Sequence, residues 1–318
     1  MNTPISLTEF ILEEERKFPK AHGDFTLLMT QLEYAGKVIA GHVRKAGLVD
    51  ILGKTGSTNS SKEEVIKLDA FANNTLIETL TSSQQVHAIA SEELEDIHSV
   101  EKHDGEYIVF LDPLDGSSNA DVDVTIGTIF SIYHKGKSLL QKGEEQVASG
   151  YILYGSSVMF VYTAGNGVHG FTFEPTVGSF LLSHPDIRIP SRGDIYSVNE
   201  ANTEGFDAAT QSYLSSLKSG TAEQKSRYVG SMVADVHRTL LKGGIFLYPR
   251  DAKYPEGKLR LLFEVNPLSF LIQHAGGKAV CHSGNPLMIT PTSLHQRSDI
   301  VLGSPENVDD YLSFTHPK

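Results

Sequence analysis

The sequence predicts an α/β protein in which helices and strands are mixed along the chain, and three observations support this fold class. The first quarter has the apolar spacing of helices. Residues 86–182 contain short apolar runs separated by Gly and Asn turns, which are typical of strands. Beyond them strand-like and helical segments alternate, which favours a mixed or parallel sheet. With 318 residues, 40% of them apolar, the chain can bury one large core or two medium ones.

The N-terminal helices are predicted from apolar residues at helical spacing. They are expected over Leu7–Glu15 and Phe25–Arg44, and a third over Glu63–Leu80. The segment 47–61 contains three glycines with Ser, Thr and Asn, so it predicts a long loop before the third helix.

Strands are predicted to dominate from Val86 to Leu182, until Ser183-His184-Pro185-Asp186 interrupts the pattern. We place a domain boundary there, giving an N-terminal domain, 1–184, and a C-terminal α/β domain, 185–318. The alternating segments of the second domain are Ile195–Val198, Phe206–Leu217, Ser231–Leu241, Ile245–Tyr248, Val265–His274, Lys278–Cys281 and Ile300–Leu302.

Two carboxylates follow a buried strand in the middle of the chain. The apolar run Tyr107–Leu111 leads into Asp112-Pro113-Leu114-Asp115, and Pro113 is expected to keep this segment from pairing as a central strand. Gly116, Ser117 and Ser118 then offer a permissive backbone and N–H groups that suit a phosphate. Carboxylates beside such a turn are what Mg²⁺ needs when it bridges protein and phosphate. A plain surface turn is the alternative.

Further acids occupy similar positions elsewhere. Val86–Ser91 ends in Glu92-Glu93, and the apolar run Leu259–Phe263 leads into Glu264. Acids that follow separate apolar runs are expected to meet at one edge of a sheet, where α/β folds place ligands. Asp69 lies in a helical segment, and by pattern alone a solvated helix face is as good an explanation as a role in the site.

Charge and cysteine content narrow the function further. The net charge of −12 disfavours nucleic acid as a partner, since phosphate-backbone binding rests on clustered Lys and Arg. No apolar run is long enough to span a membrane, and the polar, glutamate-rich start of the chain is unlike a targeting signal. The single cysteine, Cys281, fits a reducing cytoplasm and is expected to be packed in an apolar segment.

Together with these acids, further segments carry a family resemblance over nearly the whole chain. They are Lys67–Asp69, Ser91–Glu93, Asp112–Asn119, Ile126–Phe130, Tyr196–Glu200, Arg227–Arg238, Gly244–Pro249 and Gly257–Glu264. The chain closely resembles class I fructose-1,6-bisphosphatases, which belong to the Mg²⁺-dependent, lithium-sensitive sugar-phosphate phosphatases. The resemblance implies a layered α/β/α/β/α sandwich with the site in a cleft between its two halves.

The resemblance also implies residue roles. The implied metal ligands, for Mg²⁺ with Mn²⁺ as a substitute, are Glu92, Asp112, the Leu114 carbonyl, Asp115 and Glu264. Asp69 and Glu93 are the implied catalytic residues, which orient and deprotonate the attacking water. Asp115, Gly116, Ser117 and Ser118 are implied at the reacting phosphate, and Asn199, Arg227, Tyr228, Tyr248 and Lys258 at the 6-phosphate. Arg227 matches a residue supplied by a neighbouring subunit, so a homo-oligomer, a tetramer built from dimers, is expected.

Several other residues remain open. Glu63 matches a loop-associated acid of the family, and a solvated helix N-terminus explains it equally well. Met232 is expected at the sugar face, and Asn202 replaces a tyrosine found there in many animal relatives. His237 and Arg238 are interpreted as structural, and the histidine spacing does not suggest a zinc site.

The implied activity is hydrolysis of the 1-phosphate of fructose 1,6-bisphosphate in gluconeogenesis, in the cytoplasm. A sedoheptulose-1,7-bisphosphatase, or an enzyme acting on both sugars, is the alternative. Inositol monophosphatase is disfavoured, because a substrate with one phosphate would not use Tyr228, Tyr248 and Lys258. A non-catalytic sugar-phosphate sensor is disfavoured because all the acids are retained.

Regulation is where the sequence departs from the family. Many relatives are inhibited by AMP, and Gly23–Thr26 and Tyr107 match part of the site that binds it. However, Glu106 stands in place of a lysine, and His134 in place of an arginine. Each change removes a cationic side chain that would contact the phosphate of the nucleotide. AMP inhibition is therefore expected to be weak or absent, with any allosteric control exerted by another anion.

Overall fold

The computed structural model describes residues 4–17, 22–45, 54–58, 64–100, 105–136, 138–219 and 224–315, with the backbone alone for 54–58 and 64–66. Its α-helices are α1 (Leu7–Glu15), α2 (Asp24–Val43), α3 (Lys67–Ser82), α4 (Ala208–Ser219), α5 (Met232–Lys242), α6 (Asn266–His274) and α7 (Pro305–Thr315). Its 3₁₀-helices are η1 (Ser117–Val122), η2 (Gly143–Glu145), η3 (Glu200–Gly205) and η5 (Pro286–Met288), and η4 (Leu261–Val265) is a π-helix.

The larger sheet has eight strands in the order β10-β9-β8-β7-β6-β5-β3-β4. They are β3 (Val86–Ser91), β4 (His98–Ser99), β5 (Tyr107–Asp115), β6 (Ile126–His134), β7 (Gln146–Tyr154), β8 (Val158–Thr163), β9 (Val168–Glu174) and β10 (Ser179–Ile187). Neighbours pair antiparallel except β3 and β5, which are parallel. The parallel pair brings the ends of β3 and β5 together, and both of these ends carry acids.

The smaller sheet has five strands in the order β12-β11-β13-β17-β15. They are β11 (Ile195–Ser197), β12 (Lys225–Ser226), β13 (Ile245–Tyr248), β15 (Lys278–Val280) and β17 (Ile300–Gly303). Two short pairs lie outside both sheets: β1 (Lys54–Thr58) with β2 (Glu64–Ile66), and β14 (Leu259–Arg260) with β16 (Arg297–Ser298).

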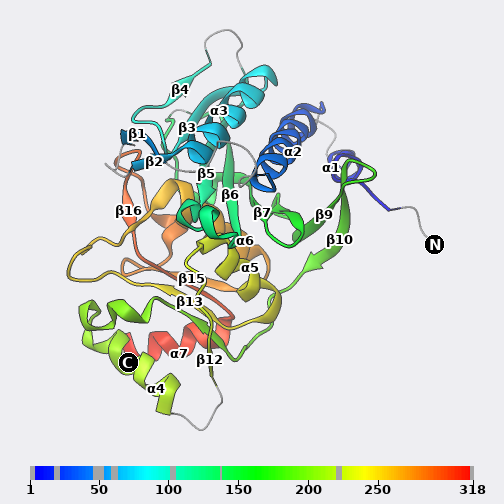
Figure 1. The fold of residues 1–318 in the computed structure, drawn as a ribbon. Coiled ribbons are helices and arrows are strands. Elements are labelled where there is room, and N and C mark those ends of the chain that lie inside the picture. The colour runs from blue at the N-terminus through cyan, green and yellow to red at the C-terminus, as the bar shows by residue number, and fades with distance from the viewer. Residues whose placement is uncertain are drawn as a thin grey trace.

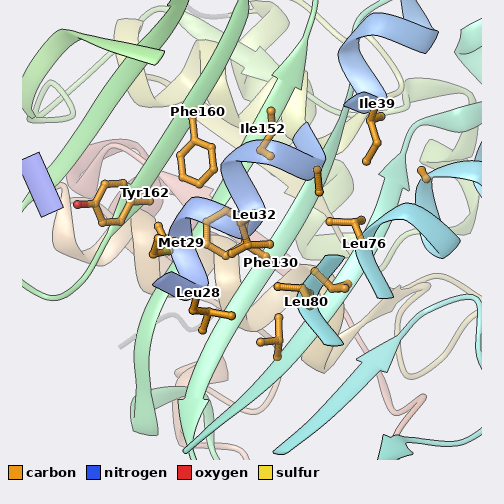
Figure 2. Close-up of a cluster of buried hydrophobic side chains, with 14 of the residues drawn as sticks. Leu28, Met29, Leu32, Ile39, Leu76, Leu80, Phe130, Ile152, Phe160 and Tyr162 are labelled. Carbon is orange, nitrogen blue, oxygen red and sulfur yellow. The ribbon is translucent and has the colours of Figure 1, made fainter. Parts of the chain in front are cut away.

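Three of the four buried clusters among the described residues define five layers, as the sequence resemblance implied. Helices α1–α3 cover one face of the larger sheet, and Figure 2 shows Leu28, Met29 and Leu32 of α2 beside Phe130 and Ile152 of that sheet. Helices α5 and α6 fill the space between the two sheets. Helices α4 and α7 cover the outer face of the smaller sheet, at the bottom of Figure 1. The mixed α/β fold is confirmed.

The predicted elements are largely confirmed, but the third helix and the loop expected over 47–61 are exceptions. In that loop Lys54–Thr58 forms strand β1, and the rest of it lies outside the described residues. Glu64–Ile66 forms strand β2 and the helix begins at Lys67, because β-branched Val65 and Ile66 favour a strand. Strand β10 continues to Ile187 with shifts in register, so the interruption expected at Ser183–Asp186 does not end it. The division into 1–184 and 185–318 stays a prediction.

The apolar run Leu259–Phe263 before Glu264 forms a strand only over its first two residues. Only Leu259 and Arg260 pair with β16, and Leu261–Val265 forms the π-helix η4 that leads into α6. A short apolar run is compatible with a buried helical turn as well as with a buried strand, and periodicity does not separate the two.

Candidate active site

A cavity of about 670 Å³ contains most of the residues singled out in the sequence. Of those residues, its lining includes Asp69, Glu92, Glu93, Asp112, Leu114, Asp115, Gly116, Ser117, Ser118, Asn199, Tyr228, Met232, Tyr248, Lys258 and Glu264. They come from α3, the ends of β3 and β5, η1, and segments of the C-terminal half. Arg227 is not in the lining, and Glu63 lies outside the described residues.

Three buried carboxylates form the centre of this cavity. Glu92, Asp112 and Glu264 each place one oxygen so that the three atoms lie within 4.8 Å of one another. Burial raises the pKa of Glu92 and Asp112 well above the usual range, and the negative charges of the neighbouring acids raise both further. Burial also raises the pKa of Glu264 to about 7. Such a group of hard oxygen donors suits a divalent cation, which would relieve this repulsion.

Asp115 is held at the first turn of α5. Its Oδ2 accepts hydrogen bonds from the Val233 N–H at 2.7 Å and from the Ser231 hydroxyl at 3.1 Å. Burial raises the pKa of Asp115 to about 6, and these hydrogen bonds oppose the rise. The carboxylate therefore joins the larger sheet to the helix layer and still lines the cavity.

The two acids after β3 are fixed by contacts of the strand with its neighbours. The Glu92 N–H donates to the Leu111 carbonyl of β5 at 2.9 Å. Ser91, at the end of β3, donates from its hydroxyl to the Asn73 side chain of α3 at 2.6 Å. Asn73 lies one turn after Asp69 on α3, so this bond places Asp69 beside the acids of β3.

Pro113 was expected to prevent strand pairing beyond Asp112, but strand β5 continues past it. It pairs with β6 through to Asp115, and a shift in register between Asp112 and Asp115 accommodates Pro113. The Thr128 hydroxyl donates to the Pro113 carbonyl at 2.8 Å, which supports the bulged backbone. Because of this bulge the two acids remain on a rigid central strand and both line the cavity.

Gly116 makes the turn from β5 into η1. Its φ is +75°, and a Cβ there would lie 2.6 Å from the Ser231 Cβ. Only glycine fits both conditions. Ser117 and Ser118 follow in the first turn of η1 and line the cavity with Gly116.

Two arginines of the cavity were missed by the sequence analysis. Arg260 pairs through Nη1 with Glu92 Oε1 at 2.5 Å, and both side chains are almost fully buried. Arg297 faces Arg260 across β14 and β16 and donates to the Lys258 carbonyl. The signal for Arg260 was a basic residue between leucines in a buried run, whereas Arg297 had no such signal.

The cavity remains strongly acidic despite these cations. Among the residues that the structure describes, its lining carries seven carboxylates, including Asp121, against three cations, Lys258, Arg260 and Arg297. An anionic substrate would therefore need metal ions to offset the negative charge.

Part of the cavity lining is polar and aromatic. Asn199, Tyr248 and Lys258 line it and also line an adjoining cavity of about 280 Å³, which contains Asn202. Tyr228 also lines the larger cavity, and burial raises the pKa of Tyr228 and Tyr248, so both hydroxyls are hydrogen-bond donors at neutral pH. Tyrosine hydroxyls beside a lysine can bind a phosphate.

The segment that carries Tyr228 is held by a buried carboxylate. Asp235 is fully buried and accepts from the Val229 N–H at 3.0 Å. Arg238 donates to Asp235 at 2.7 Å and to the Arg227 carbonyl at 2.7 Å. The Arg227 side chain is exposed and donates to the Ser226 carbonyl at 2.8 Å.

The remaining candidates, His237, Arg238 and Cys281, do not line the cavity. His237 shares a hydrogen bond of 2.8 Å with the Tyr151 hydroxyl, and burial lowers its pKa to about 4. Neither His237 nor Arg238 lines the cavity, in agreement with their structural interpretation. Cys281 is buried, as expected. Within the part of the chain that the structure describes, the group of ligand-type side chains that could hold a metal ion contains no histidine.

The structure shows no transmembrane helix among its described residues, since none of these helices is both long and apolar enough.

Known proteins match this chain along nearly its whole length. Residues 5–185 match the N-terminal domain of fructose-1,6-bisphosphatase, and residues 189–316 match its C-terminal domain. The class 1 fructose-1,6-bisphosphatase of Persephonella marina is 51% identical over 98% of both chains. The cytosolic fructose-1,6-bisphosphatase of Brassica napus is 47% identical over 96% of this chain and 94% of its own.

A solved structure agrees with these relatives. The holo form of Leishmania major fructose-1,6-bisphosphatase superposes with a TM-score of 0.94 at 41% identity, over 99% of both chains. Identity of this extent over full length, together with both domain matches, places the chain in the class I fructose-1,6-bisphosphatase family.

Proposed function

We propose that this chain hydrolyses the 1-phosphate of fructose 1,6-bisphosphate, giving fructose 6-phosphate and phosphate, as the names of its relatives suggest. The observation that supports this most is one cavity that is lined by two different kinds of side chain. The buried carboxylates Glu92, Asp112 and Glu264 line it, and so do Tyr248 and Lys258, which also line the adjoining cavity of about 280 Å³. A substrate with a phosphate at each end would use both.

The donor set fits a divalent cation. Glu92, Asp112, Asp115 and Glu264 with the Leu114 carbonyl would hold Mg²⁺, and Mn²⁺ could replace it. All five residues line the same cavity. When bound, the metal neutralises phosphate charge and stabilises the leaving oxygen.

The other residues of the cavity take the remaining roles. The backbone N–H groups of Gly116, Ser117 and Ser118 would hold the reacting phosphate. Asp69 and Glu93 would orient the attacking water and accept its proton. Asp69 is supported by the bond between Ser91 and Asn73 described above.

The far phosphate would be bound by Asn199, Tyr228, Tyr248 and Lys258. In this proposal the exposed Arg227 completes the site of a neighbouring subunit, in a tetramer built from dimers. Its side chain does not line the cavity of its own chain. The cytoplasm is the proposed location, which agrees with the cytosolic relatives.

Arg227→Ala should raise KM roughly tenfold or more and change kcat much less. Arg227 would touch only the far phosphate, so its loss weakens substrate and transition state equally. Steady-state kinetics and sedimentation at the same protein concentration test this. Lys225→Ala, which removes another exposed cation two residues away, serves as the control. A fully active monomer would contradict the shared site.

Mg²⁺ should raise the melting temperature by a few degrees at pH 8 and by much less at pH 5.5. Asp115 and Glu264 have pKa values of about 6 and about 7 in the folded protein, above their ordinary values. Folding therefore favours the protonated forms of these two carboxyl groups. The stability that this gives is fully present below their ordinary pKa values, and it is lost as pH rises through their pKa values in the folded protein. Mg²⁺ binds the deprotonated carboxylates, so its stabilisation grows over the same range.

Thermal melts at matched ionic strength, with and without Mg²⁺, would measure this difference. Glu264→Gln should reduce the gain at pH 8. An equal gain at both pH values would count against metal binding at these acids.

Sedoheptulose 1,7-bisphosphate is a second candidate substrate. The cavity of about 280 Å³ next to Asn199, Tyr248 and Lys258, where Asn202 lies, leaves room for a longer sugar. Phosphate release from both sugar bisphosphates, with and without Mg²⁺, tests the proposal. Mg²⁺-dependent release of phosphate from the fructose substrate would support the proposed enzyme activity. No release from either substrate would favour a non-catalytic sugar-phosphate sensor.

A further inference from the structure

The short segment Arg227–Ser231 connects strand β12 to helix α5 and carries side chains that serve different places. The Tyr228 side chain lines the larger cavity. The Arg227 side chain is exposed and does not line that cavity. The Ser231 hydroxyl donates to Asp115 Oδ2 at 3.1 Å. The position of this one segment therefore affects the tyrosine, the exposed arginine and the acids together.

Asp235 holds the middle of this segment. It lies in the first turn of α5 and is fully buried. Its Oδ2 accepts hydrogen bonds from the N–H groups of Val229 at 3.0 Å and Gly230 at 3.3 Å. Its Oδ1 accepts from Arg238 Nη2 at 2.7 Å. Hydrogen bonds to an ionised carboxylate are stronger than those between neutral groups, so this one side chain fixes the backbone of the segment.

Arg238 extends this hold to the start of the segment. The same Nη2 that donates to Asp235 also donates to the Arg227 carbonyl at 2.7 Å. The guanidinium group is planar, so both bonds have a fixed geometry. One ion pair within α5 therefore ties down the backbone from Arg227 to Gly230.

The two ends of the segment have further contacts that do not involve Asp235. The Arg227 N–H donates to the Tyr196 carbonyl of β11 at 2.9 Å, and the Asn119 side chain of η1 donates to the Gly230 carbonyl at 3.2 Å. The bonds to the acidic part of the cavity are also separate. Loss of the Asp235 contacts should therefore release the residues between the two ends and leave the acids in place.

The Tyr228 ring packs on the turn that Asp235 holds. Gly230 has a φ of +83°, and a Cβ there would lie 3.8 Å from a carbon of the Tyr228 ring. Burial raises the pKa of Tyr228, and the negative charge of Asp235 adds to the rise. The carboxylate thus acts on the tyrosine hydroxyl as well as on the backbone beneath the ring.

We propose that Asp235, with Arg238 as its partner, is a positioning residue for the far phosphate of the substrate in two subunits at once. It acts through Tyr228 in the cavity of its own chain and through Arg227 in the cavity of a neighbour. Neither Asp235 nor Arg238 lines the cavity, so the effect is indirect. This inference rests on the proposed function, in which the far phosphate contacts Tyr228 and Arg227.

Asp235→Asn tests this role, because asparagine keeps the shape of the side chain and only one of its oxygens. Its NH₂ group would face an N–H donor, either from the segment or from Arg238. Fructose 6-phosphate carries only the far phosphate, so its inhibition constant reports on this part of the site. We expect that constant and the KM for the bisphosphate to rise at least about tenfold, with kcat and Mg²⁺ affinity changed less than about threefold.

Steady-state kinetics with product inhibition at saturating Mg²⁺ gives KM, kcat and the inhibition constant, and calorimetry gives the Mg²⁺ affinity. Thermal melts show that each variant is folded. A purely structural role would lower the melting temperature without separating KM from kcat.

Combined variants show whether Asp235 acts through the two residues. In a protein that already carries Arg227→Ala and Tyr228→Phe, Asp235→Asn should weaken fructose 6-phosphate by less than about threefold more, because the groups that it positions are gone. An undiminished effect in this background would overturn the role.

Asp299→Asn is the matched control. Asp299 is buried, accepts from the His282 N–H at 3.0 Å and from the His282 ring at 2.6 Å, and lines neither the larger cavity nor the one beside it. This variant should leave the affinity for fructose 6-phosphate unchanged.

Arg238→Ala replaces the first variant if Asp235→Asn does not fold, because the Arg238 side chain is partly exposed. It should weaken fructose 6-phosphate several fold, and Arg238→Lys, which keeps the charge beside Asp235, should restore part of the affinity. Unchanged affinity in a folded variant, or an equal loss in Asp299→Asn, would overturn the role. A wild-type protein that binds no fructose 6-phosphate would instead overturn the proposed function, and this role with it.

Discussion

We expect Asp115→Ala to lower kcat by at least about a thousandfold, the scale of losing a principal electrostatic stabiliser of the transition state. Asp115 lies on the central strand β5, next to the buried acids Asp112 and Glu264 and before the turn at Gly116. It is therefore the acid best placed to connect a metal ion with the reacting phosphate.

The alanine variant also loses two hydrogen bonds to the start of α5, so a second variant is needed. Asp115→Asn keeps an oxygen that can accept from Val233 and Ser231 but removes the charge. Its activity should fall by a similar factor. Its melting temperature without metal should equal or exceed that of the wild type, because removing one charge relieves repulsion among the buried carboxylates.

The matched control is Asp123→Asn. Asp123 is exposed at the end of η1 and has a φ of +55°, which asparagine also adopts readily. Phosphate release by the purified proteins at saturating Mg²⁺ gives kcat, and thermal melts show that each is folded. Near-normal turnover by folded Asp115→Asn would refute the role given to this carboxylate.

Micromolar AMP should leave the activity unchanged. Of the residues that the family resemblance assigns to AMP, Asp24, Phe25, Glu106, Tyr107 and His134 line another cavity, of about 480 Å³, whose described lining contains four carboxylates. Losing one charge-assisted contact costs about 1.5–3 kcal/mol, and repulsion between Glu106 and the phosphate adds to it. AMP affinity should therefore be at least about a hundredfold weaker than in a site with both cations.

A double variant that restores both cations tests the same prediction in the opposite direction. Glu106→Lys with His134→Arg should increase AMP affinity by roughly the same factor of a hundred, since it replaces a repulsive charge and adds a bidentate donor. Inhibition curves for wild type and double variant, at saturating Mg²⁺, measure it, with adenosine as the uncharged control. Micromolar inhibition of the wild-type protein would show that other cations serve the phosphate.

Local pattern predicted much of the fold and most of the candidate site. The bounds of α1 and β13 follow from apolar spacing alone. Asp112 to Ser118 could be found because the carboxylates and the glycine turn are contiguous in sequence. Their roles in binding and catalysis, however, came from the family resemblance, and they stay predictions. The third helix was predicted to begin at Glu63 but begins at Lys67, because the pattern around Val65 and Ile66 is compatible with either a strand or a helix.

What the sequence by itself determined was the mixed fold class, the acids that would gather, and the two substitutions at Glu106 and His134. Tertiary structure alone decided that Arg260 pairs with Glu92, a residue 168 positions away in the chain. It also decided that β5 continues through Pro113 as a bulge, and that carboxylates from α1, α2 and the start of β5 share one cavity. Periodicity records which side of an element is buried, whereas the partners across a cavity depend on how distant elements pack.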